Sequence, residues 1–470
     1  MSTTFFRRSG QGHWTRMVGL VGVGLAGIAG PALISPTAAL PNPPATPRCE
    51  GVPATIVGTD GDDTLQGTPG RDVVVALGGD DFVSTGAGRD LVCAGDRWDF
   101  IRLGPGDDRA RGAGGQDQLI GGGDADRLFG GAEVDGLEGG PGDDRLWGGA
   151  GRSINVELLL GGPGDDRLAG GPGLDNVGFF KSPQGVRVNL ARGSAHGEGS
   201  DALVGIEGVA ATKHDDVIVG DRRGNGLYGL GGDDTIRAGG SGRIAAGKSD
   251  VIYGGEGDDT LVGGSGQDLV TYSGLPFPVT VDLARHRASG DGRDTLRGIE
   301  AVEGGIADDR LLGSRGADLL AGSLGNDELD GRAGRDTALY LDIRGPVDVV
   351  LDQVDGSGLG EAAGSDILRG IENVWGTNQA DELSGDGGPN RIRGLGGDDL
   401  LVGFEGVDRL DGGRGNDVCT DVPEQTTACE GARHAAHHDF DATNNRVRLG
   451  RDLMAGWTVH PATTILRRNR

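Results

Sequence analysis

The sequence is poor in aromatic residues, lysine and cysteine. Aromatic residues make up 4% of its 470 residues, three residues are Lys, and four are Cys. So few aromatic side chains argue against one large conventional core, because these residues dominate core burial. Positive charge is also scarce: Asp and Glu total 71 against 44 Lys and Arg, a net charge of −27. This balance argues against nucleic-acid or anionic-membrane binding and favours cationic partners.

Glycine and aspartate are abundant instead. The chain has 96 Gly, a fifth of its residues, and its acidic residues divide into 55 Asp and 16 Glu. Gly follows no three-residue period, which excludes collagen, and a content this high works against long helices. The composition leaves two classes, a disordered chain or a repeat built on turns, and the order of the residues decides between them.

The two ends differ from the middle. Residues 1–39 have the pattern of a signal peptide, with Arg7, Arg8 and Arg16 before an apolar stretch over 17–34 and small residues at 37–39. An uncleaved membrane anchor is the alternative, but an apolar stretch of about 18 residues broken by Pro31 is a poor spanning helix. We therefore expect a secreted, extracellular protein with no membrane insertion after signal removal.

A Pro-rich linker and N-terminal cap follow at 40–57, and a basic flexible tail is expected at 431–470. Each end carries about four net positive charges, so residues 49–430 carry about −35. His434, His437 and His438 of the tail offer a transition-metal site as an alternative to a plain polar tail. The acidity therefore belongs to the middle of the chain.

Aspartate recurs there every nine residues. An apolar residue follows each Asp two positions later, as in Leu65 and Val74, and Gly usually precedes it by two. The segment GGPGDDRLW at 139–147 shows the whole unit. The longest run is Asp63, Asp72, Asp81, Asp90, Asp99, Asp108, Asp117, Asp126, Asp135 and Asp144. Later runs are Asp166 and Asp175; Asp216, Asn225 and Asp234; Asp250, Asp259 and Asp268; Asp309, Asp318, Asp327 and Asp336; and Asp381, Asn390, Asp399, Asp408 and Asp417.

This unit predicts an all-β solenoid of stacked turns. Gly supplies the positive φ of a tight turn, and the residues after Asp form a very short strand with one inward side chain. One unit cannot bury that side chain alone, whereas stacked units form a continuous apolar ladder. Stacking also places Asp carboxylates in rows, where two charges 4 Å apart repel by ~4 kcal/mol at an effective dielectric of 20. Ca²⁺, which prefers an all-oxygen shell, relieves this repulsion. The alternative is that Asp-Gly simply makes turns and the rows are solvated.

The GGxGxDxLx blocks resemble the hemolysin-type calcium-binding repeat, also called RTX, over most of residues 58–417. The resemblance implies a right-handed parallel β-roll, with calcium ions held between turns by Asp side chains and carbonyls of the Gly region. The nine positions of GGxGxDxLx are numbered from its first Gly, so that Asp is at the sixth position. Arg97, Asp124 and Glu133 replace the fourth-position Gly, and Asn225 and Asn390 replace Asp, so weaker sites are expected there. The metal ligands that the resemblance implies are Asp63, Asp72, Asp81, Asp90, Asp108, Asp117, Asp126, Asp144, Asp166, Asp175, Asp234, Asp259, Asp268, Asp309, Asp318, Asp327, Asp336, Asp399, Asp408 and Asp417.

Three spacers divide the repeats into four roll blocks. The blocks are predicted at 58–178, 211–272, 305–340 and 377–430, and the strand spacers at 179–210, 273–304 and 341–376. The spacers repeat one another, with GSDALVGIEGV at 199–209, GRDTLRGIEAV at 292–302 and GSDILRGIENV at 364–374. Their alternating apolar residues predict half-buried strands. They resemble the longer strand segments that interrupt RTX rolls, and a coil-widening role is expected, with a carbohydrate- or partner-binding surface as the alternative.

The four cysteines fit an exported chain. An even count behind a signal peptide suggests two disulfides. The economical pairing is Cys49–Cys93 at one end and Cys419–Cys429 at the other, where a solenoid needs capping. The other two pairings and free thiols remain open.

Motifs for catalysis fail on context. The string GRIAAGKS at 242–249 fits a phosphate-binding loop, but roll turns flank it where a strand and a helix are required. Neither HExxH nor GxSxG occurs. The sequence therefore predicts a secreted, non-enzymatic β-roll that binds Ca²⁺, uses no nucleotide, and folds on meeting calcium. The alternatives are an extracellular enzyme of polysaccharide or peptide metabolism and a cell-surface adhesin.

Overall fold

Short β-strands joined by tight turns make up nearly all of the structure. The computed structural model describes residues 46–150, 156–239, 249–341, 343–351, 357–360 and 364–420. The expected signal peptide and basic tail, and the phosphate-loop string from 242 to 248, lie outside these residues. The described residues contain no helix long and apolar enough to cross a membrane; their one helical element is the 3-10 turn η1 (Leu283–Arg285).

The nine-residue unit explains each strand and turn. In the segment 139–147 a strand begins directly after Asp144, and Leu146 points inward with none of its surface exposed. Gly140 and Gly142 adopt φ of 107° and 153°, and a Cβ at either position would clash with the backbone of the preceding coil. Successive coils can therefore approach closely only because these positions carry no side chain.

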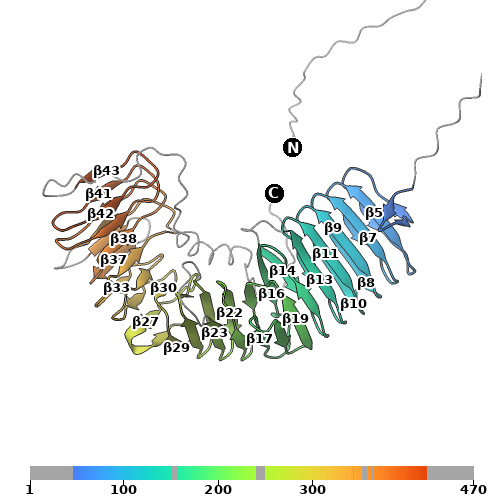
Figure 1. Ribbon diagram of the computed structural model, residues 1–470, viewed down its shortest axis with the longest axis horizontal. Helices are drawn as coiled ribbons and strands as arrows, with labels where there is room; N and C mark the ends of the chain where they lie inside the picture. Colours follow the sequence, from blue (N-terminus) through green and yellow to red (C-terminus); the bar gives the residue numbers. More distant parts are fainter. Residues whose placement is uncertain are drawn as a thin grey trace, which may run out of the picture. The chain divides into compact units, whose positions relative to one another are not determined.

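Apart from one short N-terminal antiparallel pair, the described strands form two sheets, and each coil of two repeats contributes one strand to each sheet (Figure 1). In spatial order, sheet 1 contains β3 (Ile56–Val57), β5 (Val73–Gly78), β7 (Leu91–Asp96), β9 (Arg109–Gly114), β11 (Arg127–Ala132), β13 (Arg145–Ala150), β15 (Arg167–Ala169), β19 (Ser200–Val204), β18 (Ser194–His196), β17 (Arg187–Asn189), β21 (Val217–Val219), β23 (Thr235–Gly239), β25 (Thr260–Gly264), β29 (Arg293–Arg297), β28 (Arg287–Ser289), β27 (Thr280–Asp282), β31 (Arg310–Leu312), β33 (Glu328–Asp330), β37 (Gly364–Arg369), β36 (Ser357–Gly360), β35 (Asp348–Val350), β39 (Glu382–Ser384), β41 (Leu400–Val402) and β43 (Val418–Thr420).

Sheet 2 follows chain order without insertions. It contains β4 (Thr64–Gln66), β6 (Phe82–Ser84), β8 (Phe100–Pro105), β10 (Gln118–Gly123), β12 (Gly136–Glu138), β14 (Val156–Leu160), β16 (Leu174–Gly178), β20 (Gly208–Ala210), β22 (Gly226–Gly231), β24 (Val251–Glu256), β26 (Leu269–Thr271), β30 (Ala301–Glu303), β32 (Leu319–Ala321), β34 (Thr337–Leu339), β38 (Asn373–Trp375), β40 (Arg391–Arg393) and β42 (Arg409–Asp411).

Neighbouring strands of the roll are parallel and in register. β11 pairs with β13 so that Leu128 lies opposite Leu146, one coil further along. The inward residues of both sheets form one continuous apolar column, in which Leu119, Leu128 and Leu146 are fully buried. The all-β parallel roll predicted from the sequence is confirmed, and its thin core explains how the chain folds with few aromatic residues.

Each spacer inserts an antiparallel turn-back into sheet 1 only. In the first spacer β19 pairs with β15 in parallel, then β18 and β17 follow in antiparallel order, and β17 pairs with β21. In sheet 2, β16 pairs directly with β20. The spacers around β27–β29 and β35–β37 repeat this arrangement. Each spacer therefore widens sheet 1 by two strands, or about 10 Å, while sheet 2 continues unbroken.

A disulfide closes the N-terminal end. Cys49 and Cys93 are bonded, with their Cα atoms 5.6 Å apart, which confirms this predicted pair. Cys49 belongs to the antiparallel pair β1 (Arg48–Cys49) and β2 (Val52–Pro53) and packs with Val73, Val75 and Leu91. Cys419 is also disulfide-bonded, but its predicted partner Cys429 lies outside the described residues.

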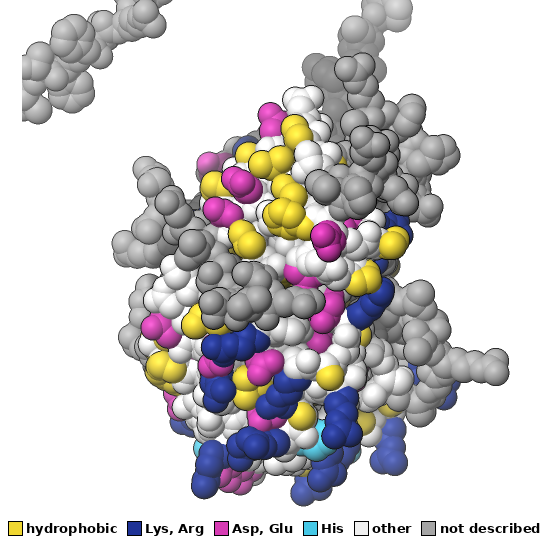
Figure 2. Space-filling view, turned by 90° about the vertical axis from the view of Figure 1, so that its left-hand side faces the viewer, with side chains coloured by type: hydrophobic (Ala, Val, Ile, Leu, Met, Phe, Trp, Pro, Cys, Tyr) yellow, Lys and Arg dark blue, Asp and Glu magenta, His cyan; other side chains and the backbone are white. Residues whose placement is uncertain are grey.

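Charge on the surface is unevenly distributed. Figure 2 shows Lys and Arg side chains gathered in its lower part, at the height at which Figure 1 draws β27 and β29. Acidic and apolar side chains lie above them. Exposed arginines on η1 and its neighbours include Arg285, Arg287, Arg293 and Arg297. This part of the surface therefore carries exposed positive charge on a chain that is acidic as a whole.

Candidate metal-binding turns

The sixth-position aspartates form a hydrogen-bonded row along each edge of the roll. The Asp126 backbone N–H donates to Asp144 Oδ1 at 2.7 Å, and the Asp108 N–H donates to Asp126 Oδ1 at 2.8 Å. The same bond recurs from coil to coil, so each carboxylate fixes the backbone of the coil before it. Both Asp126 and Asp144 are 1% exposed. The repeat thus buries a row of acidic side chains that other proteins keep in solvent.

The second oxygen of most of these carboxylates has no partner. Within the described residues, a buried Oδ2 lacks a hydrogen-bond partner in Asp81, Asp90, Asp99, Asp108, Asp117, Asp126, Asp135, Asp144, Asp166, Asp175, Asp234, Asp259, Asp268, Asp327, Asp336, Asp399 and Asp417. An unpaired buried carboxylate oxygen is strongly unfavourable unless a proton or a cation satisfies it. We call a turn of this kind an open turn.

In open turns with Gly at the first position, the Oδ2 can lie beside a backbone carbonyl of the next coil. A Cβ added to Gly121, five residues before Asp126, would clash with Asp126 Oδ2 and lie 2.7 Å from the Gly139 carbonyl oxygen of the next coil. Gly139 has the same relation to Asp144 and to the Gly161 carbonyl. Glycine at the first position therefore lets a carboxylate oxygen and a carbonyl oxygen of adjacent coils approach the same space.

Burial raises the pKa of these carboxyl groups, and neighbouring carboxylates add to the rise. The pKa of Asp126 rises from 3.8 to about 8, mainly through burial and further through Asp144 and Asp108, against the hydrogen bond from the Asp108 N–H. The pKa values of Asp117, Asp166, Asp234, Asp259 and Asp327 also rise to about 8. Without a cation, these rows favour protonated carboxyl groups near neutral pH.

Eight other turns close on themselves. In each, the backbone N–H of the second-position residue donates to the sixth-position side chain of the same turn, as Thr212 does to Asp216 Oδ2 at 2.8 Å. Thr212 Oγ1 adds a bond to the same oxygen at 3.0 Å. The closed turns are those of Asp63, Asp72, Asp216, Asn225, Asp309, Asp318, Asp381 and Asn390. Two of them begin each predicted block.

The backbone at the second position separates the two kinds of turn. It has positive φ in the open turns, including non-Gly residues such as Leu77 at 83°, Leu230 at 81° and Leu395 at 76°. No second-position residue of a closed turn is among the positive-φ residues. Its backbone N–H therefore points at the sixth-position side chain of the same turn. Thr, Ser and Asp predominate there because they favour such local bonds over the left-handed conformation.

The predicted ligands fall into both groups. Of the 20 aspartates that the resemblance implies, Asp63, Asp72, Asp309 and Asp318 lie in closed turns. Asp408 lies in the edge row, where its Oδ1 accepts the Asn390 N–H at 2.9 Å, and the other 15 lie in open turns. Asn225 and Asn390, expected to be weaker, are both in closed turns.

Replacing the fourth-position Gly keeps φ positive but lowers its value. Arg97, Asp124 and Glu133 have φ of 86°, 73° and 78°, against 136° at Gly106 and 153° at Gly142. The aspartates that follow them, Asp99 and Asp126 among them, retain an unpaired Oδ2. These turns therefore keep the unpaired oxygen on an altered backbone, and weaker calcium binding there stays a prediction.

Sequence reasoning missed the acidic residues that end each of the first three blocks. In the spacers, Asp201, Asp294 and Asp366 accept the N–H groups of Asp166, Asp259 and Asp327. Glu207, Glu300 and Glu372 accept those of Asp175, Asp268 and Asp336. The signal was present in the repeated segments, where the pattern Gly-x-Asp-x-Leu-x-Gly-Ile-Glu occurs three times.

The donor set suits a hard cation. Among the described residues, no three His, Cys, Asp or Glu side chains converge as a metal cluster. A metal in the open turns must therefore take carboxylate oxygens together with backbone carbonyls, which are the ligands that Ca²⁺ accepts and that zinc sites rarely use. The unpaired Oδ2 atoms and the glycines beside them fit Ca²⁺.

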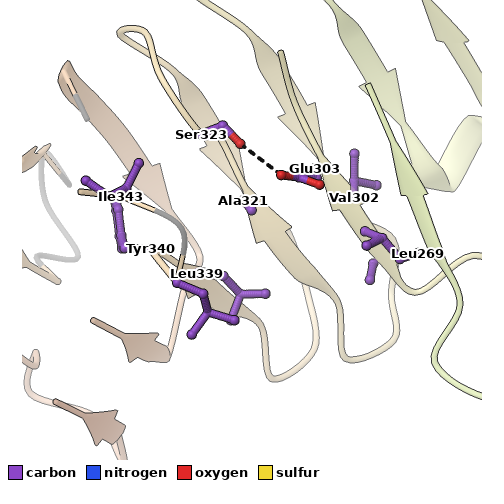
Figure 3. Close-up of a pocket in the computed structure, with 10 residues that line it drawn as sticks. Leu269, Val302, Glu303, Ala321, Ser323, Leu339, Tyr340 and Ile343 are labelled. Carbon is purple, nitrogen blue, oxygen red and sulfur yellow. Dashed lines mark hydrogen bonds between the residues drawn. The ribbon is translucent and has the colours of Figure 1, made fainter. Parts of the chain in front are cut away.

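A shallow depression in sheet 2 offers little chemistry. Its lining is mainly aliphatic, including Leu269 and Leu339, with Glu303 as its acidic residue (Figure 3). Glu303 Oε2 accepts the Thr271 hydroxyl at 2.9 Å, and Oε1 lies 3.5 Å from the Ser323 hydroxyl. These bonds hold the carboxylate in place, so nothing in this depression resembles a nucleophile with its base.

Comparisons with known proteins agree with the turns. The sequence model of a family described as the RTX calcium-binding nonapeptide repeat (4 copies) matches more than half of the chain, at residues 57–92, 94–128, 102–137, 120–154, 157–177, 211–241, 244–270, 303–338 and 384–419. No curated protein matches the chain.

Proposed function

The chain belongs to the RTX calcium-binding nonapeptide repeat family, and we propose that it is a secreted structural and binding protein whose open turns coordinate Ca²⁺. The observation that carries this proposal is the row of buried, unpaired Oδ2 atoms beside glycine carbonyls. The ligands are the open-turn aspartates, together with Asp408 in the same row. The closed turns hold no ion, because a backbone N–H already occupies the oxygen that would face it.

Folding of the roll is coupled to calcium. Without a cation, burying ionised carboxylates in rows is opposed by desolvation and mutual repulsion, so the chain remains open at neutral pH. Binding to the folded roll alone shifts the equilibrium toward it. Circular dichroism of the full chain during a calcium titration tests this coupling. A β-sheet signal that is the same in chelator and in millimolar Ca²⁺ would contradict it.

Substitutions in open and closed turns test the ligand assignment. Asp144→Asn and Asp166→Asn keep an oxygen acceptor for the neighbouring N–H but remove the charge, so each should weaken calcium binding locally while distant coils remain folded. Asp63→Asn, in a closed turn, is the matched control and should leave calcium binding unchanged. Equal calcium affinities in all three variants and the parent chain would show that the assignment is wrong.

The extracellular location rests on the signal-peptide pattern of residues 1–39 and on the disulfide between Cys49 and Cys93, since such bonds persist in oxidising compartments. Expression of the full chain with and without residues 1–39, followed by fractionation, tests it. Retention of both forms in the cell would contradict secretion.

A second function, binding an acidic polysaccharide, is favoured by one surface. Arg109, Arg127, Arg145 and Arg167 lie opposite one another on β9, β11, β13 and β15, at the ~4.8 Å strand spacing. Arg109 pairs with Glu50 at 2.8 Å, whereas no ion pair engages Arg127, Arg145 or Arg167 in the described parts of the chain. Like charges directly opposite one another are destabilising, so a polymer of carboxylated sugars would complement this row.

An aromatic pair lies beside the arginine row. Trp147 stacks on Phe129 with ring centroids 4.5 Å apart, and the residue opposite Trp147 on the next strand is the small Ala169. Trp147 is therefore not covered by a large side chain on that strand. Affinity electrophoresis in a polyuronate gel tests the surface. The double variant R127S/R145S should lose its retardation, whereas R237S/R297S should keep it; equal mobility of both variants would refute this function.

A further inference from the structure

The three Gly-Ile-Glu segments of the spacers reproduce the metal-facing part of a nonapeptide. In a regular repeat, Asp lies five residues after the first-position Gly, as Asp144 does after Gly139. The spacers have Gly298 and Glu300, or Gly370 and Glu372, only two residues apart. Ile299 and Ile371 between them are 7% and 6% exposed and anchor the segment in the core.

The carbonyl groups of Gly298 and Gly370 in the spacers lie where the first-position Gly carbonyl of the next coil lies in the regular repeats. A Cβ on Gly263 would clash with the Gly298 carbonyl oxygen and lie 2.7 Å from Asp268 Oδ2. A Cβ on Gly331 has the same relation to the Gly370 carbonyl and lies 2.7 Å from Asp336 Oδ2. The spacer thus brings a carbonyl to the open-turn carboxylate, as the next coil would.

The glutamate supplies the acid of the missing repeat. Glu300 Oε2 accepts the Asp268 N–H at 3.3 Å, and Glu372 Oε2 accepts the Asp336 N–H at 2.8 Å. In the regular rows the Asp of the next coil makes this bond. The extra methylene of Glu compensates for the shorter connection, which explains why these positions carry Glu in a chain where Asp is far commoner.

An unpaired oxygen marks both places. Asp268 and Asp336 are fully buried at 0% exposure, and the Oδ2 of each lacks a partner within the described residues. Both are the last aspartates of their blocks on this edge. Without a further ligand, each row would end on an unsatisfied buried carboxylate.

We propose that Gly298 with Glu300 and Gly370 with Glu372 each complete a calcium site, together with Asp268 and Asp336, outside the nonapeptide motif. This inference rests on the proposed calcium-binding function. The spacers are then the terminal ligand segments of the second and third blocks.

The first spacer differs and serves as an internal control. Glu207 Oε2 accepts the Asp175 N–H at 3.2 Å, but its Oε1 is paired with Arg223, which Asp221 also holds at 2.9 Å. No ion pair joins Glu300 or Glu372 to a basic side chain in the described segments. The Arg223 guanidinium therefore already compensates Glu207, and Glu207 does not need a cation.

Native mass spectrometry of the full chain in calcium tests the proposal, because it counts bound ions one by one. Glu300→Gln and Glu372→Gln keep an oxygen for the Asp N–H but lose the charge; each should bind one calcium ion fewer than the parent chain, and the double variant two fewer. Glu207→Gln and Glu382→Gln, the latter an exposed glutamate on β39, should keep the parental count.

The outcomes are separable. If the parent chain binds no calcium, the proposed function itself fails. If the parent binds calcium and the Gln variants keep its ion count, only the present inference is overturned. A Glu300→Gln or Glu372→Gln chain that fails to reach the parental circular dichroism in saturating calcium would also overturn it, since the glutamate would then serve the fold. Glu300→Asp, one methylene shorter, should lose the ion as well; an unchanged count would refute the argument from reach.

Discussion

Acid should replace calcium in folding the roll. The perturbation is a lowering of pH from 8.5 to 5.5 in excess chelator. At pH 8.5 the metal-free carboxyl groups must be ionised in the folded rows, whereas at pH 5.5 those with raised pKa take up protons. A protonated Asp126 Oδ2 becomes a donor, and the Gly139 carbonyl lies beside it as an acceptor. A proton can therefore satisfy the oxygen that otherwise requires a cation.

The magnitude follows from the raised pKa values. Asp126, with a pKa of about 8 in place of 3.8, costs on the order of 5 kcal/mol when it is kept ionised above pH 8. Five further aspartates have pKa values of about 8, Asp117 and Asp327 among them. Even at half this cost for each, the sum reaches the ~5–15 kcal/mol that stabilises an ordinary domain. The metal-free roll should therefore be unfolded at pH 8.5.

The direction is fixed by the sign of the shift. A carboxyl group whose pKa is higher in the folded than in the unfolded chain contributes stability at low pH that is lost as pH rises through its folded value. For these groups the loss begins near 3.8, the ordinary value, and is complete only above the folded pKa, which is about 6 for Asp144 and about 8 for Asp126. Calcium should abolish this dependence, because the ion displaces the protons.

Circular dichroism in chelator, recorded from pH 8.5 to 5.5, is the assay. This range stays above the isoelectric point near 4.6, where the chain would precipitate. The β-sheet signal should rise on acidification in chelator and stay constant in calcium. A metal-free signal that is flat over this range, or that falls on acidification, would refute the reasoning from burial.

Three further predictions concern the turn, the core and the disulfide. Gly122→Thr should convert the Asp126 turn to a closed turn like that of Thr212 and Asp216, and native mass spectrometry should then count one calcium ion fewer. An unchanged ion count would show that the turn conformation does not control calcium binding. Leu146→Ala removes a fully buried side chain and should cost about 2–5 kcal/mol in a denaturant titration with calcium, and a cost below 1 kcal/mol would show that the column relaxes around it. The double variant C49A/C93A opens a 44-residue separation and should lose about 4 kcal/mol from the unfolded-state constraint in the same titration, with no effect on the ion count.

The fold could be predicted because its period is carried by every repeat. Asp at nine-residue intervals, Leu or Val two positions later and Gly in the turn each specify the same local structure, so the roll follows from the pattern. The pair Cys49–Cys93 followed from economy of loop closure. The turn-back of the spacers could not be predicted, because alternating apolar residues indicate strands without fixing whether they pair in parallel or antiparallel.

The nine-residue motif also could not predict which turns are open and which are closed. The aspartates of both kinds are identical in the nine-residue register, and the difference lies at the second position. Thr212 or Ser314 marks a closed turn, but Leu230 and Ser323 occupy open ones. Residue type alone therefore predicts the φ of this position imperfectly, and the packing of the preceding coil decides the rest.

The order of the turns divides the roll into separate binding units. Each block begins with two closed turns, one on each edge, as at Asp309 and Asp318. These turns satisfy their carboxylates with backbone N–H groups, so the first coil of a block needs no ion. Open turns follow, and the first three blocks end on the acidic residues of a spacer, such as Glu372. Under the proposal above, a row that starts on a closed turn and ends on a completed site has no unsatisfied carboxylate at either end. We therefore expect each block to gain or lose its calcium largely on its own, although Asp318 of the third block still raises the pKa of Glu300 across the second spacer.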